Sequence, residues 1–248
     1  MERLNRFLAR SGVASRRASD HLILAGKVEV NGLVVTLPGT QVNPDADVVR
    51  CEGKIARPGT SKTYLLLNKP SGYIVSASDP HNPQTVFDLL EGVDARVFPV
   101  GRLDMDTTGV LLLTDDGDLS YRLTHPSFEI RKVYRAVVRG RPSAETLGQL
   151  SRGIALEDGV TTAPAQVKLI RQLGANAVLQ LTLHEGRKRQ VKLMCAAVGH
   201  RVLELARIVF AGLEVGGLEL GHYRSLTVGE VNRLCALVGI PTGTGPGD

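Results

Sequence analysis

The chain of 248 residues contains no tryptophan, and aromatic residues make up only 4% of it. Any recognition of nucleic-acid bases by stacking must therefore use a few Tyr, Phe, His or Arg side chains. Its three cysteines, Cys51, Cys195 and Cys235, lie far apart and show neither metal-binding nor redox spacing. This pattern excludes a disulfide framework and predicts reduced core thiols in a cytosolic protein.

Long apolar segments are also missing. No stretch approaches the roughly 20 apolar residues of a membrane span, and the first residues carry no apolar signal core. We therefore expect a soluble, cytoplasmic protein with no membrane partner. The formal net charge of +5 suits a polyanionic partner, although basicity of this size does not identify one.

The first part of the chain has the pattern of a small α+β unit, residues 1–54. Apolar residues at helical spacing predict two short helices within residues 2–26, the second capped by Ser15. Asn31-Gly32 between alternating residues indicates a hairpin turn, and Asp47–Cys51 is a further predicted strand. The Pro- and Gly-containing segment 55–62 is typical of a linker.

The remainder, residues 63–240, mixes apolar strands with interspersed helices, which favours an α+β domain on a mostly antiparallel sheet. The predicted strands are Tyr64–Leu67, Val110–Leu113, Tyr134–Val138, Ala165–Leu169 and Ala177–Leu183. The predicted helices are Gln84–Leu90, Ser143–Gly153 and Lys188–Val198. The tail, residues 241–248, has a disordered composition.

Cations outnumber acids in the small unit: they are Arg3, Arg6, Arg10, Arg16, Arg17 and Lys27. The first three recur at spacings of three and four, so they would share one helix face. Such a patch binds phosphates, or it is merely a solvated charged face. Residues 2–50 resemble the S4 RNA-binding domain, because a Ser-Arg-Arg and a later Gly-x-Val-x-Val-Asn-Gly follow in order. The resemblance implies structured RNA as the partner.

The most informative segment of the chain is residues 101–117. It places Asp104 in a Gly-bounded turn directly before an apolar run, where a carboxylate can be held rigidly at the floor of a cleft. The alternative is that Asp104 and Asp106 only stabilise the turn, as Asp often does.

With this segment in view, residues 62–228 resemble the pseudouridine synthases of the small-subunit and large-subunit rRNA type. Four motifs follow in that family's order, beginning at Lys69, Gly101, Lys132 and Glu185. The resemblance implies base flipping of a uridine, cleavage of its glycosidic bond and re-attachment through carbon 5. It implies an isomerisation that needs neither a metal nor an organic cofactor.

The same resemblance implies roles for individual residues. Asp104 corresponds to the catalytic aspartate, acting as nucleophile or as base. Tyr134 corresponds to the tyrosine that packs on the uracil and is implicated in removing the carbon-5 proton. Lys192 takes the basic position beside the carboxylate, and Arg102 helps to hold the RNA. Asp106 is interpreted as a residue that shapes the loop.

A basic run, Arg187, Lys188 and Arg189, precedes Lys192 at a predicted helix start. Cations are unfavourable near a helix N-terminus, so the run implies an anionic partner. Many members of the family carry His or Asn where this chain has Lys188 and Arg189, which is expected to alter RNA backbone contacts. His125 is interpreted as structural or RNA-facing.

Two other functions are consistent with parts of the sequence. The acid-rich stretch from Asp104 to Asp118 allows a Mg-dependent RNA phosphodiesterase or nuclease. A non-catalytic rRNA-binding assembly factor could keep the same fold. If the protein is the isomerase, some of its motifs resemble the small-subunit enzymes and others the large-subunit enzymes. We slightly favour 23S RNA as the substrate. The expected partner is ribosomal RNA or an assembling subunit, bound by a monomer.

Overall fold

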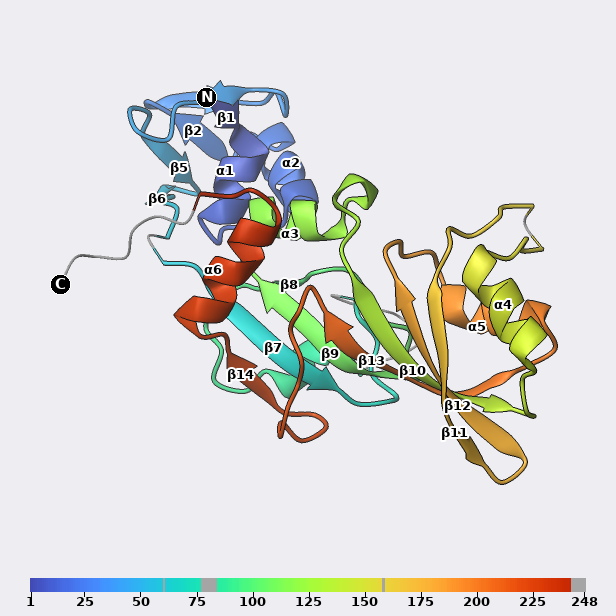
Figure 1. Cartoon of the computed structure of the whole chain (residues 1–248). Helices are drawn as coiled ribbons and strands as arrows, with labels where there is room; N and C mark the ends of the chain where they lie inside the picture. The colour runs from blue at the N-terminus through green and yellow to red at the C-terminus, as the bar shows by residue number, and fades with distance from the viewer. Residues whose placement is uncertain (60, 77–83, 158, 242–248) are drawn as a thin grey trace. The chain divides into compact units, whose positions relative to one another are not determined.

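The structure is a computed structural model, which describes residues 1–59, 61–76, 84–157 and 159–241 (Figure 1). Its contacts divide the chain into two compact units. The first holds residues 1–63 with the short segments Asp94–Val97 and Asp115–Gly117, and the second holds the rest. The predicted tail lies outside the described residues except for Pro241. No helix in the described part is long and apolar enough to cross a membrane.

The first unit is an α+β module, as the sequence predicts. Its helices are α1 (Leu4–Arg10) and α2 (Arg16–Leu24), and its strands are β1 (Glu2–Arg3), β2 (Val28–Val30), β3 (Leu33–Val35), β4 (Gln41–Val42), β5 (Val49–Cys51) and β6 (Lys54–Ile55). Strands β3-β2-β5-β6 form an antiparallel sheet, and β1 pairs with β4.

Local signals in the sequence account for this module. The Ser15 side chain accepts a hydrogen bond from the Ala18 amide and caps α2. Asn31 and Gly32 both have positive φ, which is the conformation that a two-residue hairpin turn needs. Ala56 packs in the same core as Leu4, so this ordered unit extends into the segment predicted as a linker.

The second unit is built on an eight-stranded sheet, with strand order β11-β12-β10-β13-β9-β7-β14 and β8 paired to β9. Its strands are β7 (Tyr64–Lys69), β8 (Phe98–Pro99), β9 (Thr107–Thr114), β10 (Lys132–Arg139), β11 (Gln166–Leu173), β12 (Asn176–Leu183), β13 (Val202–Phe210) and β14 (Tyr223–Ser225). Within this described sheet, only the β9–β13 pairing is parallel. β9 is buried along nearly its whole length, as its continuous apolar sequence predicts.

Helices cover two parts of this sheet (Figure 1). They are α3 (Gly117–Thr124), α4 (Ala144–Arg152), α5 (Gln190–Ala197) and α6 (Val228–Leu237), with short 3₁₀ turns at Val86–Leu89 and Pro126–Phe128. α4 and α5 pack with β10 and β12 in one apolar cluster. α3 and α6 pack with β7 and β9 in another. Cys51, Cys195 and Cys235 are buried free thiols, which confirms their predicted place in the cores.

Two predictions about local structure were wrong, and one predicted helix is present but begins two residues later. Gln84–Leu90 is a single 3₁₀ turn, because Thr85 and Asp88 cap each other across only four residues. The helix predicted from Lys188 begins at Gln190, because Arg189 has a left-handed backbone with φ 55°. Arg3 lies in β1 before α1 begins, so it does not share a helical face with Arg6 and Arg10.

The start of α6 predicts a loss of stability in acid. Glu230 forms a capping box with Thr227 and pairs with Arg224 at 2.7 Å. The Arg224 hydrogen bond lowers the Glu230 pKa from 4.5 to about 2. Because the folded-state pKa is the lower one, this stabilisation is complete above pH 4.5 and disappears as the pH falls towards 2. We expect a contribution of about 1–2 kcal/mol, since solvent screens the half-exposed arginine.

Urea unfolding of wild type and Glu230→Gln, followed from pH 7 to pH 2, measures this contribution. The difference between the two proteins should be largest at neutral pH and should vanish in acid. A difference that does not change with pH would contradict the prediction.

Candidate active site

Asp104 lies in the turn that leads from β8 into β9. The Thr107 amide donates to the Asp104 carbonyl at 3.0 Å, and Leu103 is buried beside it. The Asp104 side chain is 32% exposed. The buried strand that follows holds one end of the turn fixed, while the carboxylate can still reach solvent or a ligand.

Lys69, at the end of β7, holds this turn from beneath. Its fully buried ammonium donates to the carbonyls of Pro70, Met105 and Thr107 at 2.9, 3.0 and 3.0 Å. Burial lowers the Lys69 pKa to about 8, against the opposing effects of Asp106 and Asp104. The lysine therefore connects β7 to the backbone on both sides of Asp106.

Lys69→Met should lower the free energy of unfolding by about 1–3 kcal/mol. The change leaves buried carbonyls without their donor, and relief of the buried charge offsets only part of that cost. Urea unfolding measures the loss, and Lys168→Met, at an exposed position of β11, is the matched control. Equal stability of the two variants would show that the three hydrogen bonds contribute nothing.

Lys192, on α5, lies between the two carboxylates of the turn. Its ammonium is 3.3 Å from Asp104 Oδ2 and makes a hydrogen-bonded ion pair with Asp106. The hydrogen bond from Lys192 lowers the Asp106 pKa. Lys192 is 13% exposed whereas Asp106 is 64% exposed. From the sequence alone, Asp106 is interpreted only as a residue that shapes the loop. The structure adds a direct ion pair between Asp106 and Lys192.

Tyr134 reaches the same region from β10. It is opposite Leu181 of β12 and Arg207 of β13, and a β-bulge in the β10–β13 pairing falls between Val133 and Tyr134. Bulges beside functional sites redirect a side chain out of the regular alternation. Tyr134 is half-buried and packs against the apolar cluster of β10, β12 and α5.

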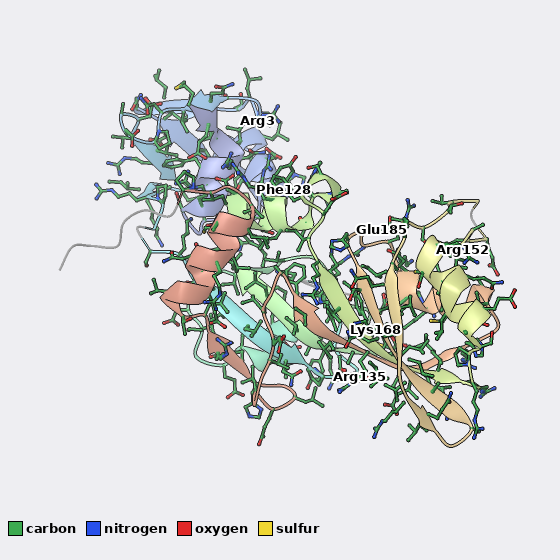
Figure 2. The ribbon with its side chains drawn as sticks, viewed as in Figure 1. Arg3, Phe128, Arg135, Arg152, Lys168 and Glu185 are labelled. Atoms are coloured by element: carbon green, nitrogen blue, oxygen red, sulfur yellow. The ribbon has the colours of Figure 1, made fainter. Side chains whose placement is uncertain are left out.

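A cleft of about 570 Å³ in the second unit brings these elements together. Asp104 and Tyr134 line it, and so do Arg102 and the basic segment 187–189. Figure 2 labels Glu185 in the loop after β12. Glu185 accepts from the Ala163 amide at 2.9 Å, and it holds the Arg187 guanidinium at 3.4 Å. Cations therefore ring a cleft that is also lined by the carboxylates of Asp104 and Glu185 and by the Tyr134 phenol.

The predicted cations of the first unit have two kinds of surroundings. Arg6 and Arg10 pair with Glu2 at 3.5 and 2.9 Å, and Lys27 pairs with Glu52 at 2.7 Å. Arg3, Arg16 and Arg17 are exposed, and no described carboxylate forms an ion pair with them. The charge available to a polyanion is thus greatest around the start of α2.

His125 has a structural position. It precedes the short 3₁₀ turn Pro126–Phe128, and its Nδ1 accepts from the Ser127 amide at 3.3 Å. Among the described residues, no group of three or more His, Cys, Asp or Glu side chains is arranged to hold a metal ion.

Sequence reasoning missed one buried cation of the second unit, Arg207 on β13. It is only 2% exposed, and its Nε donates to the Val110 carbonyl at 2.9 Å. The available signal was the alternation of β13, which places Arg207 on the same face as Leu205 and Val209, both of them buried.

Comparison with known proteins agrees with this geometry. Residues 63–197 match the family described as RNA pseudouridylate synthase, and residues 2–48 match the S4 domain. The chain is 46% identical to ribosomal large subunit pseudouridine synthase B of Bacillus subtilis, covering 96% of this chain and 97% of that protein. It is 43% identical to an RNA pseudouridine synthase of Aquifex aeolicus, covering 96% and 95%. A solved pseudouridylate synthase shares 30% identity with a TM-score of 0.69, covering 94% of this chain and all of that one.

Proposed function

The chain belongs to the RNA pseudouridylate synthase family and carries an S4 domain, and from this premise we propose that it isomerises a uridine of large-subunit (23S) ribosomal RNA. The overall length and the S4 domain match a relative that is named for the large subunit. The observation that supports the site assignment is the cleft in which Asp104 and Tyr134 meet, with Lys192 3.3 Å from the carboxylate.

In the proposed reaction, Asp104 is required for breaking the bond between N1 of uracil and C1′ of ribose. The detached base turns, a bond forms between C5 and C1′, C5 loses its proton and N1 gains one. Atoms and electrons balance within the nucleotide, so no oxidant or energy donor enters. The Lys192 ammonium, 3.3 Å from Asp104 Oδ2, pairs with the carboxylate that serves as nucleophile or base.

Tyr134 is the proposed partner on the base. A phenol offers a flat face for packing on uracil and a polar tip that can accept the C5 proton. The scarcity of aromatics in the chain gives this residue added weight, because few other rings are available to line the cleft.

RNA binding is proposed to use both units. Arg102, Arg187, Lys188 and Arg189 ring the cleft, and they can hold the backbone around a flipped nucleotide. Residues 1–54, with Arg3, Arg6, Arg10, Arg16, Arg17 and Lys27, anchor structured RNA through phosphate contacts. Residues 55–62 connect them to the catalytic residues 63–240. We further propose that the enzyme acts in the cytoplasm as a monomer, on free rRNA or on an assembling subunit.

Pseudouridine mapping of ribosomal RNA tests the proposal. RNA from a strain lacking the gene should lose one pseudouridine in 23S RNA, and expression of the wild-type chain should restore it. Unchanged modification in both ribosomal RNAs would contradict the proposal, and loss of a 16S site would contradict the subunit assignment.

The alternative functions give different results in the same assay. A Mg-dependent nuclease would cut the RNA and lose activity in chelator. An assembly factor would support ribosome assembly without forming pseudouridine. Pseudouridine formation that resists chelator supports the isomerase and opposes both.

A further inference from the structure

Arg207 is the largest fully buried side chain of the second unit, and it is a cation. No described carboxylate forms an ion pair with it. Its Nε donates to the Val110 carbonyl, and its guanidinium carbon lies 4.7 Å from the centre of the Phe210 ring. Its Nη2 is buried and has no hydrogen-bond acceptor in the described structure.

Such a side chain does not serve the stability of the fold. A buried charge without an opposite charge loses its hydration and gains little in return. An apolar side chain of similar length would fill the same volume at lower cost. Burial also lowers the Arg207 pKa, which has the same physical origin. The cost is consistent with a role for Arg207 in the chemistry of the site.

The position of Arg207 in the sheet connects it to the reactive groups. β13 lies between β10 and β9, so Arg207 pairs with Tyr134 on one side and with Gly109 on the other. The Tyr134 phenol is near enough to the guanidinium to oppose the effect of burial on the Arg207 pKa. One residue therefore connects the strand of the phenol to the strand that follows Asp104.

We propose that Arg207 is a positioning residue that acts through Tyr134. The buried guanidinium orients the phenol oxygen and favours its proton-accepting, negatively charged form. That oxygen then takes the proton from C5 after the new C5–C1′ bond has formed, and the electron pair of the C–H bond restores the uracil double bond. The proton remains on the tyrosine oxygen and then passes to solvent. This inference rests on the proposed function and adds a residue to it.

Other charged groups lie in the same cleft as Tyr134 or interact with Arg207 and Asp104. The cleft is lined by Asp104 and Arg102 before β9 and by Glu185 and the cations 187–189 after β12, while Lys132 on β10 interacts with Arg207 and Lys192 on α5 pairs with Asp104. Burial and the nearby Arg207 charge together lower the Lys132 pKa to about 8. A change of Arg207 also alters the titration of Lys132, so the comparison in a Tyr134→Phe background is what assigns a shifted pH profile to the phenol.

The test measures kcat and KM from pH 6 to pH 10 on an RNA transcript that carries the mapped uridine. Arg207→Met should lower kcat at neutral pH by about 100-fold, the size of a general-base effect, while KM changes by less than about threefold. Its rate should continue to rise at a pH where the wild-type rate is level. Arg207→Lys should recover part of the loss, because it restores a cation. Arg135→Met, at an exposed position next to Tyr134 on β10 (Figure 2), should match wild type.

The decisive comparison places Arg207→Met in a Tyr134→Phe background. If Arg207 acts through the phenol, adding Arg207→Met to Tyr134→Phe should lower kcat by less than about threefold. An equal loss in both backgrounds would overturn the proposal, as would a wild-type pH profile for Arg207→Met. If Arg207→Met does not fold, the same comparison with Arg207→Lys decides. If the wild type forms no pseudouridine, the proposed function itself is contradicted. If the wild type is active but the effects of Arg207→Met and Tyr134→Phe on kcat are independent, only the proposed role of Arg207 is contradicted.

Discussion

Asp104→Asn is expected to reduce pseudouridine formation by about 10³-fold or more. Asparagine keeps the size of the side chain but can act neither as a nucleophile nor as a base. It also removes the charge that faces Lys192 at 3.3 Å. RNA affinity should be kept or slightly increased, because the variant removes a negative charge from a cleft that binds a polyanion. Single-turnover rates and a filter-binding measurement separate the two effects.

Asp106→Asn is the matched control for this experiment. It lies in the same turn, contacts the same lysine and undergoes the same change of charge. Because its side chain is largely exposed and does not line the main cleft, we expect a loss of less than about tenfold. If Asp104→Asn and Asp106→Asn lower the rate of pseudouridine formation to a similar extent, then the activity depends on the total charge of the turn and not on the Asp104 carboxylate in particular.

Gly109→Ala is expected to lower the free energy of unfolding by about 3–5 kcal/mol. A Cβ at this position would lie 2.2 Å from the Arg207 carbonyl oxygen, and the backbone has φ 101°. β9 and β13 would have to separate at the parallel pairing that connects the Asp104 turn to the rest of the sheet. Because domains are stable by only about 5–15 kcal/mol, most of the protein's margin would be lost.

Urea unfolding, together with amide exchange of β9, measures this effect. Gly117→Ala is a suitable comparison, since a Cβ there meets nothing within 4 Å, and its stability should change by less than about 1 kcal/mol. Protection of the β9 amides at the wild-type level in Gly109→Ala would show that the strands tolerate the methyl group.

Much of the site could be predicted from the sequence because its motifs are local. The turn around Asp104 depends on glycines and a following apolar strand, and both can be read within a few residues. The fold class and the five strands predicted between Tyr64 and Leu183 follow from apolar periodicity, but the order of strands in the sheet does not. The pairing of Lys192 with Asp104 was expected only through family resemblance, since 88 residues of chain (192 − 104) separate them.

The missed features of the site depend on distant parts of the chain, whereas α6 was missed although a local capping box marks its start. Arg207 shares a strand face with the apolar Leu205 and Val209, but the strands that enclose it, β10 and β9, come from distant parts of the chain. The contact of Asp106 with Lys192 depends on where α5 begins. That start is set by the left-handed backbone of Arg189, which apolar periodicity does not reveal.

The sharing of Lys192 between two carboxylates has a consequence for how RNA enters. The Lys192 and Lys69 ammonium groups together balance the two carboxylates, so the turn carries little net charge, while cations surround the rim of the cleft. A phosphate is therefore attracted to the rim and not to the floor, whereas an uncharged uracil ring can occupy the floor. The cleft thus sorts the parts of a nucleotide by charge, so that a flipped residue enters base first.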